Sequence, residues 1–317
     1  MKNKEPLILA VVVFFSLVTY YLVEPFAHHV LHKKVVDAPS EGFAYTDLPA
    51  MTKTGNAAAG QELVMNAGCA GCHSIDVADM PAPMDPVMSA QSYGVNPPDL
   101  SNAGAIYDAN FLADLIKNPA HALKVEHKFD EAQGQMHPMV AFYGMGGDID
   151  QEVADMVAYL QSIAVKPADV TPAMAFENAC ARCHALGYKN ATQLGTKPIF
   201  KHKKDDLAYD IQVLEYQDSL KAYMGKLPPD LSMYIRSRGD DFLRKLIENP
   251  QHILEGTAMP RVGVTADAAE KVIEHMKDAG DPKRQEREEI GMNVMIYIVI
   301  FAIFALLWKK QVWKELH

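Results

Sequence analysis

The sequence CAGCH at residues 69–73 recurs later in the chain as CARCH at residues 180–184. Two thiols three positions apart lie on the same side of a helical turn, so both can bond the vinyl groups of one porphyrin. The histidine that follows then presents its imidazole to the iron. The two motifs contain all four cysteines of the 317-residue chain, and they predict two covalently bound haem c groups.

Other meanings of a C-x-x-C pair fit this chain less well. A zinc site needs a second pair of ligands for each motif, and the chain has no cysteine to spare. A thioredoxin-like redox pair needs a βαβ context, which the sequence does not predict. The candidate haem residues are therefore the thioether-forming Cys69, Cys72, Cys180 and Cys183, with His73 and His184 as iron ligands.

Two further blocks repeat behind the motifs in the same order. NPPDLS at residues 96–101 recurs as LPPDLS at 227–232, and FLADLIKNPAHAL at 111–123 recurs as FLRKLIENPQHIL at 242–254. Three blocks in a shared order predict two copies of one domain. The second copy carries an additional segment at about 201–223, rich in charge and tyrosine, which we expect on the surface as a loop or a helix.

The hydrophobic periodicity within both copies is helical. The blocks at 111–123 and 242–254 place apolar residues on one face of a 3.6-residue period and end at Asn-Pro. A short helix is also predicted at 57–66. Further helix starts are predicted at three capping residues, Asp148, Thr171 and Thr265. No alternating β pattern is evident, so the predicted fold class is all-α.

A sixth iron ligand must come from far enough along the chain to reach the opposite face of each haem. In the second copy Met259, within TAMPRVG, is the candidate. In the first copy Met139 is favoured, because Met-Val-Ala-Phe resembles the common Met-Pro-Ala-Phe ligand loop. The alternatives to Met139 that stay open are Met136, His137 and Met145.

Two uncharged apolar stretches lie near the chain ends, at about 6–23 and 290–308. Each approaches the ~20 residues that a helix needs to cross a bilayer. No small-residue cleavage site follows the first stretch directly, so we interpret it as an uncleaved anchor. Lysines precede the first stretch and follow the second, which predicts both chain ends in the cytoplasm. Because C-x-x-C-H haem attachment is periplasmic in bacteria, we expect a bacterial inner-membrane protein with periplasmic haem domains.

These features divide the chain into five parts. We expect an N-terminal transmembrane anchor at 1–34, a linker or partner-contact segment at 35–56, the first domain at 57–166, the second at 167–284, and a C-terminal transmembrane anchor with a cytoplasmic tail at 285–317. The formal net charge of −10 argues against nucleic acid as a partner, because phosphates attract an excess of Lys and Arg. The same charge is compatible with docking of a basic protein.

The haem motifs, the PPDLS blocks and the Met-Pro at 259–260 resemble tandem class I cytochrome c domains over roughly residues 56–276. In that family a prolyl carbonyl orients the proximal histidine, and Pro98 and Pro229 are the matching residues. The final apolar helix with its WKKQVWKELH tail, and the VEPFAHH segment near the first span, resemble the dihaem cytochrome c1 type of some bacterial cytochrome bc complexes. Ordinary cytochrome c1 has one haem, so the second domain and the N-terminal span depart from it.

The resemblance implies an electron-transfer subunit of quinol–cytochrome c reductase. Its partners would be a cytochrome b subunit, a Rieske iron–sulfur protein as donor, and a soluble cytochrome c or a terminal oxidase as acceptor. The sequence contains no paired carboxylates, nucleophile or phosphate loop that we recognise, so we expect no substrate chemistry of its own. Two alternatives stay open: the dihaem subunit of a cbb3-type cytochrome oxidase, usually anchored only at its N-terminal side, and a dihaem cytochrome c peroxidase, which needs a displaceable haem ligand.

Overall fold

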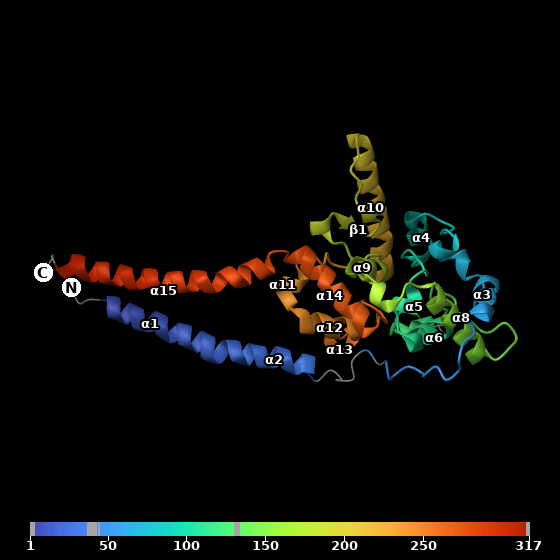
Figure 1. The fold of residues 1–317 in the computed structure, drawn as a ribbon, viewed down its shortest axis with the longest axis horizontal. Helices are drawn as coiled ribbons and strands as arrows, with labels where there is room; N and C mark the ends of the chain where they lie inside the picture. The colour runs from blue at the N-terminus through green and yellow to red at the C-terminus, as the bar shows by residue number, and fades with distance from the viewer. Residues whose placement is uncertain (1–3, 37–42, 44, 130–133, 315–317) are drawn as a thin grey trace.

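The computed structural model describes residues 4–36, 43, 45–129 and 134–314. Across these residues the regular secondary structure is helical apart from isolated bridges and a short antiparallel pair, β1 (Ala191–Thr192) with β2 (Gly195–Thr196). The all-α prediction is therefore confirmed. Two long helices extend to one side of a globular part that contains both repeated units (Figure 1).

The first repeated unit begins with a helix that matches its predicted range. Asn56 caps this helix, α3, by accepting hydrogen bonds from the N–H groups of Ala58 and Ala59. Asp148 caps the last helix, α8, as predicted, through the N–H of Asp150. The short turn η2 begins at the first cysteine of the motif, and the short turn η3 follows the motif. The elements are α3 (Ala57–Asn66), η2 (Cys69–Gly71), η3 (Asp76–Ala78), α4 (Pro86–Tyr93), α5 (Ala103–Ile106), α6 (Ala109–Lys117), α7 (Pro119–Ala122) and α8 (Ile149–Ile163).

The second unit repeats this order, with a much longer helix, α10, in the place of α4. Thr171 and Thr265 cap their helices as predicted, each accepting from the N–H three positions on. Asn118 and Asn249, which end α6 and α12, have nearly the same backbone angle, with φ −147 and −148. The elements are η5 (Pro167–Asp169), α9 (Pro172–Ala179), η6 (Gly187–Lys189), α10 (Lys203–Met224), α11 (Tyr234–Arg238), α12 (Asp240–Glu248), α13 (Pro250–Ile253) and α14 (Ala266–Gly280).

Two glycines allow helices of the first unit to approach α8 closely. A Cβ added to Gly60 on α3 would lie 1.9 Å from the carbonyl oxygen of Asp155. A Cβ added to Gly104 on α5 would lie 2.4 Å from the backbone of Gln161. Real Cβ atoms do not come this near to backbone, so only glycine permits these contacts. The two close approaches fix α8 against α3, which leads into the first motif, and against α5.

The two units share one apolar core. Ile106 and Phe111 of the first unit and Phe176 and Met276 of the second belong to the same cluster of buried side chains. Backbone hydrogen bonds from Asp108 to Gly263 and from Thr265 to Ile106, both 2.9 Å, flank a bridge between residues 107 and 264. The repeated units therefore form one packed body.

Residues 45–56, within the segment expected to be a linker or a partner contact, pack on both units. The buried hydroxyl of Tyr45 donates to the carbonyl of Val264 at 2.6 Å. The N–H of Asn56 donates to the carboxylate of Asp155 at 2.7 Å. Because these contacts reach the second unit and the first, this part of the segment belongs to the folded body and is not a free tether.

The additional segment of the second unit forms α10, a 22-residue helix. Its N-terminal half extends away from the globular part (Figure 1), as expected for a surface insertion. Its C-terminal half packs on α4 of the first unit, where Ala90 joins its apolar cluster. The buried residues of α10 are Val213, Tyr216, Leu220 and Met224. The insertion therefore also joins the two units, which its charged composition did not predict.

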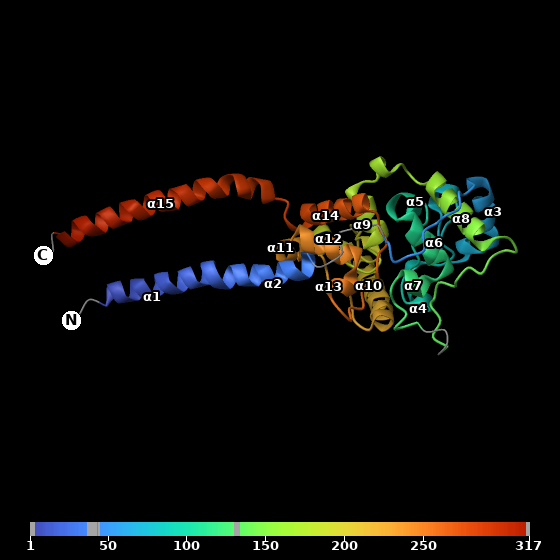
Figure 2. The same ribbon diagram turned by 90° about the horizontal axis from the view of Figure 1, so that it is seen from below.

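The chain ends form two long apolar helices. α1 (Glu5–Val18), the π-helical segment η1 (Thr19–Val23) and α2 (Glu24–Val36) continue as one helix, and α15 (Arg284–Lys314) is the other. Both are long and apolar enough to cross a membrane, and their apolar windows are not buried in the protein. Both views show the two helices leaving the globular part on one side, with the chain ends together (Figures 1 and 2). Consistent with this, Lys309 lies 3.6 Å from Glu5.

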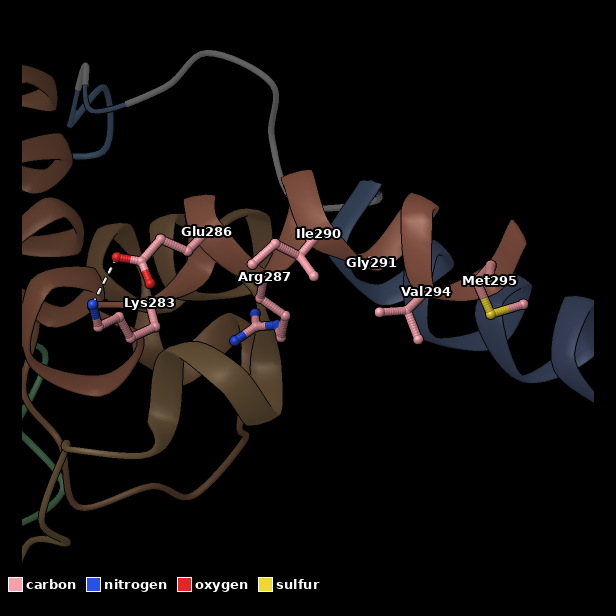
Figure 3. Close-up of a pocket in the computed structure, with 7 residues that line it drawn as sticks. All are labelled: Lys283, Glu286, Arg287, Ile290, Gly291, Val294 and Met295. Carbon is pink, nitrogen blue, oxygen red and sulfur yellow. Dashed lines mark hydrogen bonds and ion pairs between the residues drawn. The ribbon is translucent and has the colours of Figure 1, made fainter. Parts of the chain in front are cut away.

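A groove of about 600 Å³ lies along the first turns of α15, where charged residues give way to apolar ones. Figure 3 shows its lining side chains on one helix face, with Lys283 paired to Glu286 at 2.6 Å. Arg287 in the same lining pairs with Asp281 at 2.6 Å. Since its lining lies within residues 283–295, the groove includes neither C-x-x-C-H motif.

Replacing Gly60 by alanine is expected to destabilise the first unit, because the new methyl group meets backbone that cannot turn aside. Overpacking of this kind costs about 1–3 kcal/mol, which exceeds the gain in helix propensity of about 1 kcal/mol over most of that range. The thermal unfolding midpoint of the purified chain, followed by circular dichroism, should fall. Gln61→Ala, at an exposed position of the same helix, is the matched control. Equal midpoints in both variants would contradict the close α3–α8 contact.

Candidate haem-binding sites

Both C-x-x-C-H motifs fold as the same tight turn behind a helix. In the first motif, the N–H groups of Cys72 and His73 donate to the carbonyl of Cys69 at 3.2 and 3.0 Å. The second motif repeats both bonds to its first cysteine, Cys180, at 3.1 and 2.9 Å. The turn keeps the two thiols and the imidazole of each motif close together in the chain, as attachment to one porphyrin requires.

Each motif histidine is held by a prolyl carbonyl. Nδ1 of His73 lies 2.8 Å from the carbonyl oxygen of Pro98, and Nδ1 of His184 lies 2.8 Å from that of Pro229. A carbonyl only accepts, so Nδ1 carries the proton and Nε2 keeps its lone pair. A neutral imidazole with a free Nε2 is the form that binds a metal. The predicted contacts of Pro98 and Pro229 are confirmed.

The surroundings of both histidines favour the neutral form. Burial lowers the pKa of His73, and the positive charge of Arg182 lowers it further. Burial also lowers the pKa of His184. The hydrogen bonds to the prolyl carbonyls act in the opposite direction on both pKa values, but burial is the larger effect. At neutral pH both imidazoles therefore present an unprotonated Nε2.

The PPDLS blocks also fasten the loop that follows each motif. Asp99 and Ser101 accept hydrogen bonds, both 3.1 Å long, from the N–H groups three and four positions after His73. In the second unit Asp230 and Ser232 accept from the corresponding N–H groups at 2.8 and 3.0 Å. One repeated block thus supplies both the carbonyl for the histidine and the acceptors for the loop behind it.

The thiols lie in environments unlike those of redox-active cysteine pairs. Burial raises the pKa of Cys69 and Cys183, and it raises the pKa of Cys180 to about 12. Redox-active pairs instead have a thiol of lowered pKa. All four cysteines are free, and no group of three or more His, Cys, Asp or Glu within the described residues could hold a bare metal ion. Two thiols and one imidazole with a free Nε2 in each motif fit haem c.

The four candidates for the sixth ligand in the first unit differ in their surroundings. Met139 is half-buried, whereas Met136 and Met145 are 61% and 52% exposed. Nδ1 of His137 accepts from the N–H of Met139 at 3.1 Å, and its Nε2 lies 3.4 Å from the hydroxyl of Tyr223. Both ring nitrogens of His137 are therefore engaged, and Met139 is the least exposed of the three methionines.

The loops that carry Met139 and Met259 occupy matching places, between α7 and α8 and between α13 and α14. Phe142, close behind Met139, packs with the apolar cluster that includes Cys69. Ala258, directly before Met259, packs with the cluster that includes Cys183. Each loop is thus brought to the apolar surroundings of the motif in its own unit.

The structure also brings to the motifs three side chains that sequence reasoning did not single out: Tyr93, Arg182 and Tyr216. The Tyr93 hydroxyl lies 3.6 Å from the sulfur of Cys72. Arg182 Nη1 donates to the carbonyl of Asn96 at 3.4 Å. Of these three residues only Arg182 stands out in the sequence, because the first motif has Gly71 at the corresponding position.

Comparison with protein-family models matches residues 57–164 to cytochrome c and residues 247–316 to the cytochrome c1 family. A search of curated proteins found no match. A solved structure described as a hyperthermophilic respiratory complex III is similar with a TM-score of 0.36 and 22% identity, over 46% of this chain and 75% of that one. That likeness is too distant to bear on the function of this chain. The family matches, by contrast, cover the whole first unit and the C-terminal part of the second together with α15.

Replacing Ser232 by alanine is expected to leave the N–H of Tyr188 without its acceptor. Ser232 is 3% exposed, and a hydrogen bond of this kind contributes about 0.5–1.5 kcal/mol, so the thermal unfolding midpoint should fall. Ser237→Ala removes an exposed hydroxyl bonded to Tyr234 and is the matched control. If the two variants unfold at the same temperature, the loop contact contributes nothing measurable.

Proposed function

We propose that this chain is a membrane-anchored dihaem cytochrome c subunit of a quinol–cytochrome c reductase, the cytochrome bc complex. It accepts electrons from a Rieske iron–sulfur protein, beside a cytochrome b subunit, and passes them to a soluble cytochrome c or a terminal oxidase. The observation that carries the proposal is the cytochrome c1 family match over 247–316, because it runs through the Met259 loop and α15. The cytochrome c match at 57–164 supports a haem domain in the first unit as well.

In this proposal each motif holds one haem, which supplies a reversible one-electron couple. Pro98 and Pro229 orient the imidazoles through Nδ1, so that each Nε2 faces the metal position in a single tautomer. A methionine as the second axial ligand raises the reduction potential relative to a second histidine. The residues assigned are Cys69, Cys72, Cys180 and Cys183 as thioether partners, His73 and His184 as proximal ligands, and Met139 and Met259 as distal ligands.

The arrangement of the helices supports a subunit that reaches outward from a membrane. The second unit adjoins the apolar helices, where α2 contacts α12. The first unit lies on the far side of the second in both views (Figures 1 and 2). With both chain ends beyond the two spans, both motifs lie on one side of the membrane. We assign this side to the periplasm of a bacterial inner membrane, because C-x-x-C-H haem attachment takes place there.

The two alternatives fit these observations less well. A dihaem subunit of a cbb3-type oxidase is usually anchored at its N-terminal side only, whereas α15 is a second apolar helix of 31 residues. A dihaem peroxidase needs a haem whose distal ligand can be displaced to admit peroxide. In each unit the loop before the last helix carries a half-buried methionine, which favours two fully ligated haems.

Purification of the chain from its native membrane in mild detergent is expected to yield a cytochrome b and a Rieske iron–sulfur protein in stoichiometric amounts. Mass spectrometry of the chain itself should find two covalently added porphyrins. A copper–haem oxidase in place of the Rieske protein would support the cbb3 alternative and contradict the proposal. Fewer than two porphyrins would contradict the dihaem assignment whatever subunits are found.

Replacing Met259 by leucine is expected to remove the sulfur-to-iron charge-transfer absorption of one haem, which reduces that band to about half, and to lower the potential of that haem. Met139→Leu should remove the other half. Met136→Leu, at an exposed position, is the matched control and should leave the absorption unchanged. A loss of the band in Met136→Leu but not in Met139→Leu would overturn the assignment in the first unit.

A further inference from the structure

Arg182 lies inside the second motif, but its polar contacts reach the first unit. Nη1 donates to the carbonyl of Asn96, two residues before the Pro98 whose carbonyl holds His73. The positive charge of the guanidinium also acts on the pKa of Tyr107, another residue of the first unit, and opposes the rise that burial causes. The side chain therefore crosses the junction between the units and points toward the segment that positions His73.

Arg182 has no anionic partner among the described residues. Its Nε is buried and makes no hydrogen bond there. The arginines that do form ion pairs in the described part of the chain are Arg244, Arg261, Arg284 and Arg287. A guanidinium is charged at every accessible pH, and a buried charge is costly unless an anion is placed beside it. The site thus has a positive charge and an N–H group that the protein itself does not satisfy.

The position of this cation is fixed from two sides. The hydroxyl of Tyr216 donates to the backbone carbonyl of Arg182 at 2.8 Å and accepts from the N–H of Asn96 at 3.2 Å. Tyr216 is itself fully buried and lies on α10, the long helix between the second motif and its PPDLS block. One phenol therefore ties the second motif to the loop that precedes Pro98, so Arg182 cannot move away from the first unit without breaking one of these bonds.

We propose that Arg182 is the counter-ion for a carboxylate of the haem held by His73, supplied across the junction by the other motif. The inference rests on the proposed function, because it requires haem at the first motif. The propionate carboxylates are the ionised groups on the rim of haem c, and a guanidinium pairs with a carboxylate through two parallel N–H donors. Nε and Nη2 lie on one edge of the guanidinium and provide such a pair of donors, while Nη1 on the other side is bonded to Asn96.

The pairing affects the reduction potential of this haem. A reduced haem carries one more negative charge than an oxidised one, so a fixed cation nearby stabilises the reduced form. Because Arg182 is partly buried, salt screens this effect less than it would at an exposed position. Arg182 thus raises the reduction potential of the haem in the first unit above the value that this haem would have with an uncharged residue at position 182.

The test is a spectroelectrochemical titration of the detergent-purified holoprotein and its variants. At the wild-type midpoint, Arg182→Gln should lower the ratio of reduced to oxidised His73 haem roughly tenfold, the effect of about 1.4 kcal/mol. Arg182→Lys should retain most of the ratio, because it keeps the charge. Arg236→Gln removes an exposed arginine and should leave the ratio unchanged. The His73 couple is identified as the one that Met259→Leu leaves in place.

A shift in Arg182→Gln no larger than that in Arg236→Gln overturns the proposal, as does an equal loss in Arg182→Lys and Arg182→Gln. Should Arg182→Gln fail to fold, an experimental structure of the wild-type holoprotein decides by itself: a guanidinium nitrogen within hydrogen-bond distance of a haem carboxylate supports the pairing, and a longer separation overturns it. Haem stoichiometry and bound subunits, measured on the same preparation, separate this failure from a failure of the proposed function.

Discussion

The hydrogen bond between each motif histidine and a prolyl carbonyl joins segments 25 positions apart in the first unit and 45 in the second. Both bonds are nevertheless 2.8 Å long. The contact determines which imidazole nitrogen is free, and a metal ligand needs that choice made before the metal arrives. The carbonyl must therefore be held rigidly. The Pro-Pro pair restricts the backbone around it, and Asp99 and Asp230 fasten the following residues to the loop behind the motif.

The same constraint explains where the two units can differ. The additional residues of the second unit lie between its motif and its PPDLS block, and they leave that contact intact because they fold outward as α10. The C-terminal half of α10 also lies at the junction between the units, where the hydroxyl of Tyr216 bonds to both of them. The two units thus share one arrangement of motif, prolyl carbonyl and loop, and the longer segment of the second unit makes the pair asymmetric.

The loop that carries Met259 is anchored on the other unit as well. Arg261, two residues further on, is 2% exposed and donates through Nε to the carbonyl of Ala122 on α7. Its Nη1 forms two bonds to Asp47, at 2.9 and 2.7 Å, so the segment before the first unit closes over the loop of the second. The ring of Tyr45 lies under the guanidinium of Arg261, with 5.6 Å between Cζ and the ring centroid. Residues 45–56 belong to the segment 35–56, whose lack of periodicity predicted a linker or a partner contact, and these long-range contacts hold them on the folded body.

The sequence by itself determined the local features of this protein. Helix starts at Asn56, Asp148, Thr171 and Thr265 depend on side chains two or three positions away from the N–H groups they cap, and the spacing within C-x-x-C-H is equally local. The Pro98 and Pro229 contacts were predictable because a repeated block marked them. Only the tertiary structure decided what depends on distant residues: the different exposures of the candidates for the sixth ligand in the first unit, the burial of Tyr216 on a helix of charged composition, and the place of Arg182, which forms no ion pair within the described residues. The pattern of a single segment cannot carry such information, because burial and charge pairing are properties of surfaces that meet only after folding.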